Sequence, residues 1–160
     1  MNADGSNASP LLPGEPFNDY AGAWSPDGER IVFVSDRALG RELFIVDDDG
    51  TNLRQISDEG RLVGDPAWSP DGTEIVHWEL GNDGEIQLFR RVVEADTVQL
   101  VSTPGSNNGA PLWNADGIYF DTDRDGLWNV YRMGENGERP ERISEIEGNS
   151  GRVTKAPDGS

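Results

Sequence analysis

Short apolar runs alternate with turns rich in glycine, proline and aspartate along the whole chain. Residues 31–34 (IVFV) leave no polar face, and residues 42–47 (ELFIVD) are apolar on both sides. Runs of this length, rich in β-branched residues and bounded by turns, are typical of strands buried on both faces. Residues 52–57 instead alternate between polar and apolar positions, which predicts an exposed outer strand. No long run has a period of 3.6 residues, so we expect an all-β fold.

These features recur with a fixed period. Trp24, Trp68 and Trp113 each begin a W-x-x-D-G element, and they follow one another at intervals of 44 and 45 residues. A weaker copy, K-A-P-D-G, begins at Lys155. A second marker recurs with the same period, because D-G-T-N in the first unit matches D-G-S-N near the N-terminus. Two markers that share one period indicate a true structural repeat.

Each unit predicts four short strands. In the first unit AGAWS is followed by a P-D-G turn, in which proline presets φ and glycine accepts a positive φ. Four antiparallel strands per unit, with middle strands that are apolar on both faces, need a neighbouring sheet on either side. Radial repetition of such sheets gives a β-propeller. We expect complete blades at residues 20–58, 64–103 and 109–145.

The two ends predict partial blades within one propeller segment, residues 1–160. Residues 1–14 resemble the end of a preceding blade, and residues 150–160 resemble the first strand of a further one. The expected fold class is therefore all-β, with three complete blades of four antiparallel strands and partial strands at both termini. Three blades do not close a ring, since propellers typically carry about four to eight. Either the chain is a fragment of a longer propeller, or two copies associate into a six-bladed ring that buries two open apolar faces. We expect self-association.

W-S-P-D-G, an I-x-F-x-S-D-R strand and an aliphatic strand ending near D-G-x-N resemble the TolB-like propeller repeat, a relative of WD-repeat blades. The residues that carry the resemblance are Trp24, Ser25, Pro26, Asp27, Gly28, Ile31, Phe33, Ser35, Asp36, Arg37, Asp49, Gly50, Thr51 and Asn52. The second unit departs from the pattern at 77–79 (HWE), and the third has lost the proline of its turn. The match covers most of the chain. It is a specific signal for the fold and a weak one for function, because the same blade serves many roles.

The resemblance implies a binding role. Propellers of this family work in the cell envelope, where they contact a peptidoglycan-associated lipoprotein. It therefore implies a periplasmic or secreted module that binds an envelope protein or peptide. Similar blades also occur as accessory propellers of oligopeptidases and pectate-degrading lyases, so the alternative is a module of a hydrolase or lyase whose catalytic part is not in this chain. The N-terminal residues MNADGSNASPLLPG have neither a basic region nor an apolar core, so we expect no signal peptide within them.

The formal net charge is −17, from 13 basic and 30 acidic residues. Such a chain repels phosphate backbones and anionic lipids, which argues against nucleic-acid binding and membrane attachment. No apolar run approaches the roughly 20 residues of a membrane span. Lys155 is the only lysine. The charge therefore fits either solubility by self-repulsion or adaptation to high salt, and both interpretations remain open. The absence of cysteine rules out a disulfide framework.

Calcium is the one cofactor that the sequence suggests. Asp121, Asp123 and Asp125 stand at alternate positions in D-T-D-R-D-G, and carboxylates in a glycine turn can converge on a hard cation. The segment is not an EF-hand, because Arg132 stands where the bidentate glutamate would be. In the alternative interpretation Asp123 is the repeat aspartate that corresponds to Asp36, and its neighbours belong to a hairpin turn.

Catalytic signals are weak. His77 is the only histidine, so a histidine zinc cluster cannot form, and its strand context favours a core position. Neither a G-x-S-x-G elbow nor a phosphate-binding glycine loop occurs. We therefore expect no catalytic residues and no enzyme activity in this chain.

The tryptophans fit packing better than ligand binding. Trp24, Trp68 and Trp113 stand at the repeat phase, which predicts that they pack between blades. Trp78 and Trp128 fall in predicted strands and are expected in the core.

Overall fold

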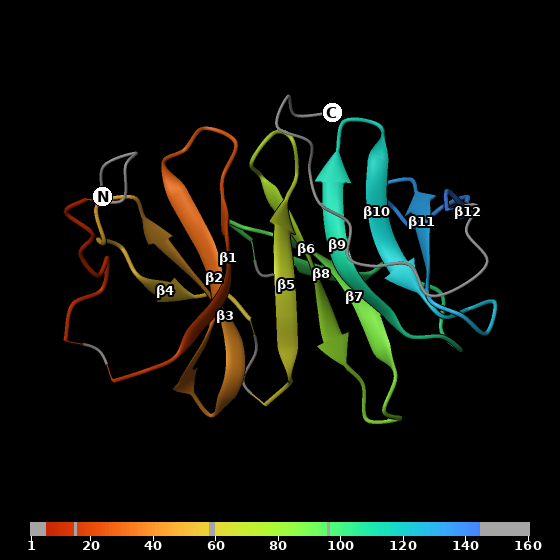
Figure 1. Ribbon diagram of the computed structural model, residues 1–160, viewed down its shortest axis with the longest axis horizontal. Coiled ribbons are helices and arrows are strands. Elements are labelled where there is room, and N and C mark those ends of the chain that lie inside the picture. The colour runs from red at the N-terminus through yellow and green to blue at the C-terminus, as the bar shows by residue number, and fades with distance from the viewer. Residues whose placement is uncertain (1–5, 15, 58–59, 96, 145–160) are drawn as a thin grey trace.

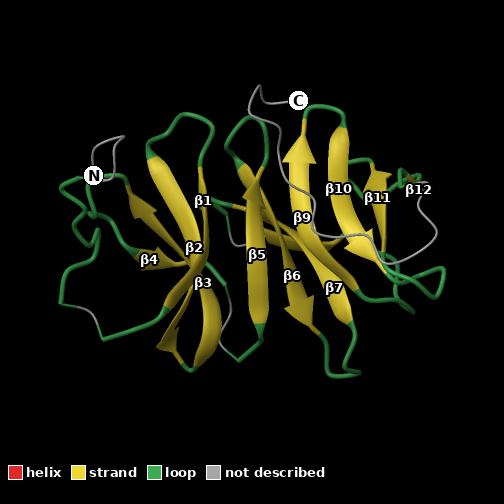
Figure 2. Cartoon of the chain, in the orientation of Figure 1, coloured by secondary structure: helices red, strands yellow, loops and turns green. Residues whose placement is uncertain are grey.

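The computed structural model describes residues 6–14, 16–57, 60–95 and 97–144. Within these residues the chain forms strands, turns and loops, as Figures 1 and 2 show. The strands are β1 (Asp19–Trp24), β2 (Arg30–Ala38), β3 (Gly40–Asp47), β4 (Arg54–Gln55), β5 (Val63–Trp68), β6 (Glu74–Leu80), β7 (Ile86–Val92), β8 (Thr97–Leu100), β9 (Asn108–Asn114), β10 (Gly117–Thr122), β11 (Asn129–Met133) and β12 (Glu141–Arg142). No helix in the described part is long and apolar enough to cross a membrane.

The strands form three antiparallel sheets of four, in the orders β1-β2-β3-β4, β5-β6-β7-β8 and β9-β10-β11-β12. The sheets stand side by side in chain order, and the first strands β1, β5 and β9 are neighbours (Figure 1). This is the arrangement of β-propeller blades, with the first strand of each sheet innermost. The predicted all-β propeller fold is confirmed. We call the three sheets the first, second and third blade.

Equivalent residues occupy equivalent places in the three blades. Ring side chains pair across the two middle strands of each blade, as Phe33 with Phe44, His77 with Phe89, and Phe120 with Tyr131. The histidine of the second blade therefore stands where the other two blades carry phenylalanine. Because the sequence repeat and the strand register coincide, each blade can be compared with the others residue by residue.

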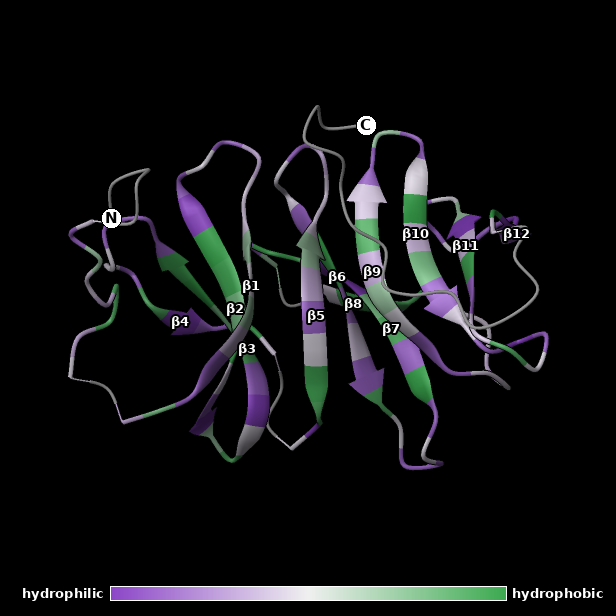
Figure 3. Cartoon of the chain, viewed as in Figure 1, coloured by the Kyte–Doolittle hydropathy of each residue, from purple (hydrophilic) through white to green (hydrophobic). Residues whose placement is uncertain are grey.

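The core lies between the blades. One apolar cluster joins the first blade to the second and includes Leu43, Ile45, Trp68 and Ile75. A second cluster joins the second blade to the third through Val76, Leu88, Trp113, Ile118 and Phe120. Figure 3 shows the same distribution, with hydrophobic colour in the middle of β2 and β10 and hydrophilic colour at the turns. Strands buried on both faces therefore arise because each blade is covered by its neighbours.

The W-S-P-D-G turn is held by its serine and aspartate. The Ser25 hydroxyl donates to the Asp27 carboxylate at 2.5 Å and accepts from the Arg30 backbone N–H at 2.9 Å. Gly28 has a φ of 76°, which glycine adopts without strain. Ser69 makes the corresponding bonds in the second blade, so the motif is a closed turn that sets the β-hairpin register.

A serine hydrogen-bonded to the third strand holds the end of each blade in place. The hydroxyl of Ser57 accepts a hydrogen bond from the Leu43 backbone N–H at 2.8 Å and donates to the Glu42 carboxylate. Ser102 contacts Gln87 and the Leu88 N–H in the same way, and Ser144 contacts Asn129 and the Val130 N–H. A serine after each short outer strand thus anchors that strand to the beginning of the third one.

The innermost strands carry an irregularity at one shared position. Ala21, Asp65 and Ala110 have φ values of 47°, 43° and 45°, and the strand register shifts beside each of them. Such bulges bend an inner strand and leave part of the ladder unpaired. Because they recur at the same position in all three blades, these bulges are part of the structural repeat.

The sequence predicts partial blades at both ends of the chain. Residues 6–14 form turns and bends without a strand, although they lie against the first blade where a preceding blade would sit. The strand expected at residues 150–160 lies outside the described residues.

Candidate functional site on the first blade

The first blade has an apolar face that no other blade covers within the part of the chain that the structure describes. Phe33, Phe44 and Val46 form a cluster on this face, with Ile31 packed beside them. Trp24 lies at the inner edge of the same blade and is 59% exposed, whereas its counterparts Trp68 and Trp113 are 6% and 5% exposed. The tryptophan prediction is therefore confirmed for the second and third blades and wrong for the first, because Trp24 has no preceding blade to pack against among the described residues.

The N-terminal segment covers part of this face. Leu12 packs against the apolar cluster, and Gly50 approaches Leu11 so closely that an added Cβ would lie 2.6 Å from the Leu11 carbonyl oxygen. A cleft of about 380 Å³ remains between this segment and the inner strands. It is lined by Pro10, Leu11, Leu12, Asp19, Tyr20, Ala21, Gly22, Ile31, Phe33 and Val46. We call this surface the first-blade cleft.

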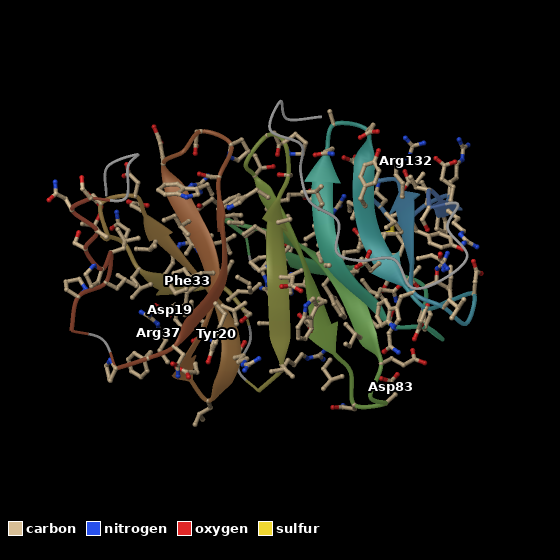
Figure 4. All side chains as sticks on the ribbon, in the orientation of Figure 1. Asp19, Tyr20, Phe33, Arg37, Asp83 and Arg132 are labelled. Atoms are coloured by element: carbon tan, nitrogen blue, oxygen red, sulfur yellow. The ribbon has the colours of Figure 1, made fainter. Side chains whose placement is uncertain are left out.

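Arg37 closes one end of the apolar face. Its guanidinium carbon lies 5.3 Å from the Phe33 ring centroid and 5.2 Å from that of Phe44, and it forms an ion pair with Asp19 at 2.9 Å. The Nε atom donates to the Ser35 hydroxyl at 2.8 Å. Figure 4 shows Asp19, Tyr20, Phe33 and Arg37 gathered on the same blade. The arginine of the S-D-R motif thus covers these aromatic rings with its guanidinium group.

The aspartate of the S-D-R motif ties two loops together. The Asp36 carboxylate accepts hydrogen bonds from the backbone N–H of Asn18 at 2.8 Å and from its side-chain amide at 2.7 Å. These bonds, the side-chain amide first, hold the pKa of Asp36 below its usual value. The pair fixes the entry of β1, which is the strand that borders the first-blade cleft.

The opposite end of the row of blades is chemically different. Ile118 and Phe120 point toward the second blade, so the alternating residues of β10 and β11 face the other way. Those residues are Tyr119, Asp121, Val130 and Arg132. Arg132 is paired with Asp116 and Glu141, well away from the first-blade cleft (Figure 4). The sequence predicts two open apolar faces, but among the described residues this end also carries the charged side chains of Asp121 and Arg132.

The three predicted calcium ligands have other partners in the structure. Asp123 accepts two hydrogen bonds from Asn107, and Asp125 accepts one from the Tyr131 hydroxyl. Asp121 is buried in β10. No group of three acidic, histidine or cysteine side chains that could hold a metal occurs in the described part of the chain. Calcium at these residues therefore stays a proposal.

His77 lies in a buried polar cluster between the first and second blades. Its Nε2 atom is 3.1 Å from the Glu79 carboxylate, which also pairs with Arg61 at 3.0 Å. Burial lowers the pKa of His77, which favours the neutral ring, and in the tautomer with its proton on Nε2 the ring donates to the Glu79 carboxylate. Burial alone would raise the pKa of Glu79, but the His77 hydrogen bond and the Arg61 charge hold it below its usual value. Burial raises the pKa of Glu42, which faces this cluster from β3.

The remaining tryptophans follow the prediction in part. Trp78 packs at the edge of the interface between the second and third blades, and its indole N–H donates to Asp65 at 3.1 Å. Trp128 lies just before β11 rather than within a strand.

Two known proteins illustrate the sequences that resemble this chain. The chain is 31% identical over 147 residues to a TolB homolog of Chlorobium chlorochromatii, covering 91% of this chain and 33% of that protein. It is 35% identical over 83 residues to the uncharacterized peptidase YuxL of Bacillus subtilis, covering 51% of this chain and 13% of the peptidase. The chain thus spans a third or less of the length of these relatives.

Solved structures share the fold. TolB from Acinetobacter baumannii superposes with a TM-score of 0.84 at 22% identity, covering 98% of this chain and 39% of that one. A puromycin-hydrolyzing peptidase of Mycobacterium tuberculosis gives a TM-score of 0.72 at 23% identity, covering 87% and 24%. The family model described as the TolB beta propeller domain matches residues 12–117. Because that match spans well over half of the chain, the protein belongs to the TolB β-propeller domain family.

Proposed function

We propose that this chain is a non-catalytic propeller module that binds protein, and that it self-associates to complete a closed ring. The observation that carries the proposal is the first-blade cleft. Of its lining residues, Phe33 and Val46 are buried, whereas the side chains of Leu11 and Tyr20 are 37% and 40% exposed. Exposed contiguous apolar surface on a soluble protein marks an interaction site.

The chemistry of the described residues favours binding over catalysis. His77 is the only histidine in the sequence and is fully buried against Glu79, so it cannot reach a substrate. The first-blade cleft is lined by aliphatic and aromatic side chains, with Asp19 already paired to Arg37. Such a surface recognises apolar side chains of another protein or peptide.

The solution mass tests self-association. Size-exclusion chromatography with light scattering should show a species of twice the 17.5 kDa chain mass. A folded monomer at all concentrations would rule out the closed ring. Binding of an envelope protein or peptide would then be examined by titrating labelled envelope extracts with the chain and with a Phe33→Asp variant, in which the apolar face is interrupted.

A second candidate is an accessory propeller of a hydrolase or lyase. It is favoured by the 35% identity to the peptidase YuxL, of which the matched part is only 13%. In this case the first-blade cleft is covered by further blades of a longer chain, and the isolated chain is monomeric. Joining the chain to the segments that adjoin it in its gene should then raise its unfolding temperature and bury Trp24, measured by a blue shift of tryptophan fluorescence.

The proposal extends to location and cofactor. Family membership favours a periplasmic or secreted protein, which immunodetection in fractionated producer cells would check. Calcium bound by Asp121, Asp123 and Asp125 would require Asp123 and Asp125 to give up their present hydrogen bonds. Calorimetric titration should show a calcium isotherm that disappears in Asp123→Ala, and a wild type without any isotherm would dismiss calcium.

A further inference from the structure

We infer that a cleft between the second and third blades binds an arginine side chain of a partner protein or peptide. The inference rests on the proposed protein-binding role and names the chemistry of the partner. The cleft has a volume of about 550 Å³, within the range of roughly 300–1,000 Å³ that ligand pockets occupy. It lies beside the β5–β6 and β9–β10 turns (Figure 1), and all of its lining residues belong to these two blades. We call it the interblade cleft.

The interface between the first and second blades carries a guanidinium group at the corresponding place. Arg30, the first residue of β2, places its guanidinium carbon 5.0 Å from the centroid of the Trp68 ring. The same guanidinium donates to the Gly72 carbonyl at 3.1 Å and pairs with Glu94 at 3.3 Å. An aromatic ring, a glycine carbonyl and a carboxylate therefore hold a cation at this interface.

Glu74 stands at the repeat position of this arginine in the next blade. It begins β6 as Arg30 begins β2. Its carbonyl accepts a hydrogen bond from the Ser69 N–H, as the Arg30 carbonyl accepts one from Ser25. The second blade therefore reaches toward the third with a carboxylate, where the first blade reaches toward the second with a guanidinium.

The groups that contact a guanidinium are nevertheless kept at the second interface. Trp113 and Gly117 hold the repeat positions of the tryptophan and the glycine that contact Arg30, and both line the interblade cleft. Glu135 and Glu138, in the turn after β11, line it as well. The ring, the glycine and the carboxylates are present, and the cation has to come from another molecule.

The charge of the interblade cleft suits an organic cation. Its acidic lining residues are Asp71, Glu74, Asp116, Glu135 and Glu138. Two arginines contact this lining, since Arg90 lies 3.6 Å from Glu74 and Arg132 lies 3.2 Å from Asp116, so the acidic side chains outnumber them. No three acidic side chains in the described part of the chain are arranged to hold a metal ion. A planar guanidinium, with its several N–H donors, fits such dispersed carboxylates better than a metal ion does.

Two polar groups on the wall of the cleft have no hydrogen-bond partner among the residues that the structure describes. The Trp113 side chain is 5% exposed, yet its indole N–H has no acceptor, whereas the Trp68 N–H donates to the Ala23 carbonyl at 3.0 Å. The Asn114 Oδ1 atom is buried and accepts no hydrogen bond. A guanidinium N–H can donate to Asn114, and a backbone carbonyl beside the arginine can accept from Trp113. The pair therefore favours an arginine within a peptide over a simple cation.

An NMR titration with short peptides tests the arginine site. Acetylated and amidated Gly-Arg-Gly, added to the ¹⁵N-labelled chain, should shift the Trp113 indole signal, which Trp113→Phe assigns. The same peptide with citrulline should bind about tenfold more weakly or worse, because citrulline keeps the shape of arginine without its charge. A lysine peptide should also bind more weakly, since an ammonium group lacks the planar donor array.

Glu74→Arg supplies a matched variant, because it rebuilds the arrangement of the first interface and fills the interblade cleft from within. It should weaken binding of the arginine peptide about tenfold or more without lowering the unfolding temperature. Asp48→Arg makes the same change of charge in an exposed turn of the first blade and should stay within about twofold of wild type.

An unchanged Trp113 signal would overturn the arginine site. Equal binding of the arginine peptide and of the citrulline or lysine peptide would overturn it too, and so would equal losses in the two variants, because attraction by the net charge of −17 would then explain the binding. Light scattering on the same samples separates the two proposals. A dimer that leaves the peptide unbound overturns the arginine site alone, and a monomer that binds the peptide as expected overturns ring closure alone.

Discussion

The carboxylate of Asp123 accepts hydrogen bonds from the backbone N–H of Asn107 at 2.7 Å and from its side-chain amide at 2.8 Å. Asp36 and Asn18 make the same pair in the first blade. In the second blade Leu80 stands at this position, and only its backbone N–H bonds to the Leu62 carbonyl. The aspartate that looked like a metal ligand in the sequence is thus a clasp between the entry of an inner strand and the end of the next one.

Loss of this clasp should lower stability. Asp123→Ala removes two acceptors from Asn107, and we expect the free energy of unfolding to fall by about 1–2 kcal/mol. Asp123→Asn serves as the control, because it keeps one acceptor and should lose less free energy of unfolding. Leu80→Ala is not suitable as a control, because it also removes apolar surface. Urea unfolding followed by fluorescence measures both. Equal stability of Asp123→Ala and wild type would show that the clasp contributes nothing.

Gly64 and Gly109 occupy the same repeat position, but their replacement by alanine should change stability by different amounts. A Cβ on Gly64 would lie 2.3 Å from the Trp78 ring, while a Cβ on the equivalent Gly109 meets nothing within 4 Å. Gly64→Ala should therefore displace Trp78 from Asp65 and destabilise the chain by about 1–3 kcal/mol. Gly109→Ala should stay within about 0.5 kcal/mol of wild type. Thermal unfolding of the two variants compares them directly, and equal losses would contradict the steric explanation.

Stability should fall as the pH drops below about 6.5, the usual pKa of histidine. Burial lowers the pKa of His77 in the folded chain, so below this value the unfolded chain binds a proton that the folded chain refuses. This one group contributes a slope of at most about 1.4 kcal/mol per pH unit. Glu79 adds a further loss at lower pH, because its folded pKa lies below its usual value.

His77→Phe removes the histidine together with its hydrogen bond to Glu79, and phenylalanine is the residue that the first and third blades carry at this position. Urea midpoints between pH 5.5 and 6.5 should slope less in the variant than in wild type. Parallel slopes would mean that His77 does not control this pH range.

Trp68, which is buried between two blades, should contribute more to the free energy of unfolding than the exposed Trp24. Trp68→Ala empties a buried site and removes the bond to Ala23, so we expect a loss of about 3–5 kcal/mol. Trp68→Phe keeps most of the ring volume and should lose about 1 kcal/mol for the missing hydrogen bond. Chemical unfolding gives both values. A Trp68→Ala chain as stable as wild type would contradict the placement of the core between blades.

Salt should stabilise the chain. With a net charge of −17, self-repulsion is screened as the Debye length falls from about 10 Å at 0.1 M to 3 Å at 1 M. The unfolding temperature should therefore rise with sodium chloride. A rise that continues to molar salt favours adaptation to high salt, whereas a flat response over the whole range would contradict both the repulsion and the adaptation.

The sequence alone determined the blades. Its two repeat markers, the S-P-D-G turns and the doubly apolar runs were enough to predict four antiparallel strands in each unit and an all-β propeller fold. The sequence was sufficient to predict the strands because turn type and strand burial depend mainly on residues that are close together in the chain. The same local reading could not decide the role of Asp123, since a carboxylate in a turn looks alike whether it meets a cation or Asn107.

Only the tertiary structure decided which repeat positions are complete. Trp24, Trp68 and Trp113 are equivalent in sequence, yet burial separates the first from the other two, because burial depends on whether a preceding blade is present. The apolar cleft beside Tyr20 and Val46 arises for the same reason. A repeat encodes the blade, but the contacts at either end of a row depend on what lies next to it in space, and that is set by packing and not by the local sequence.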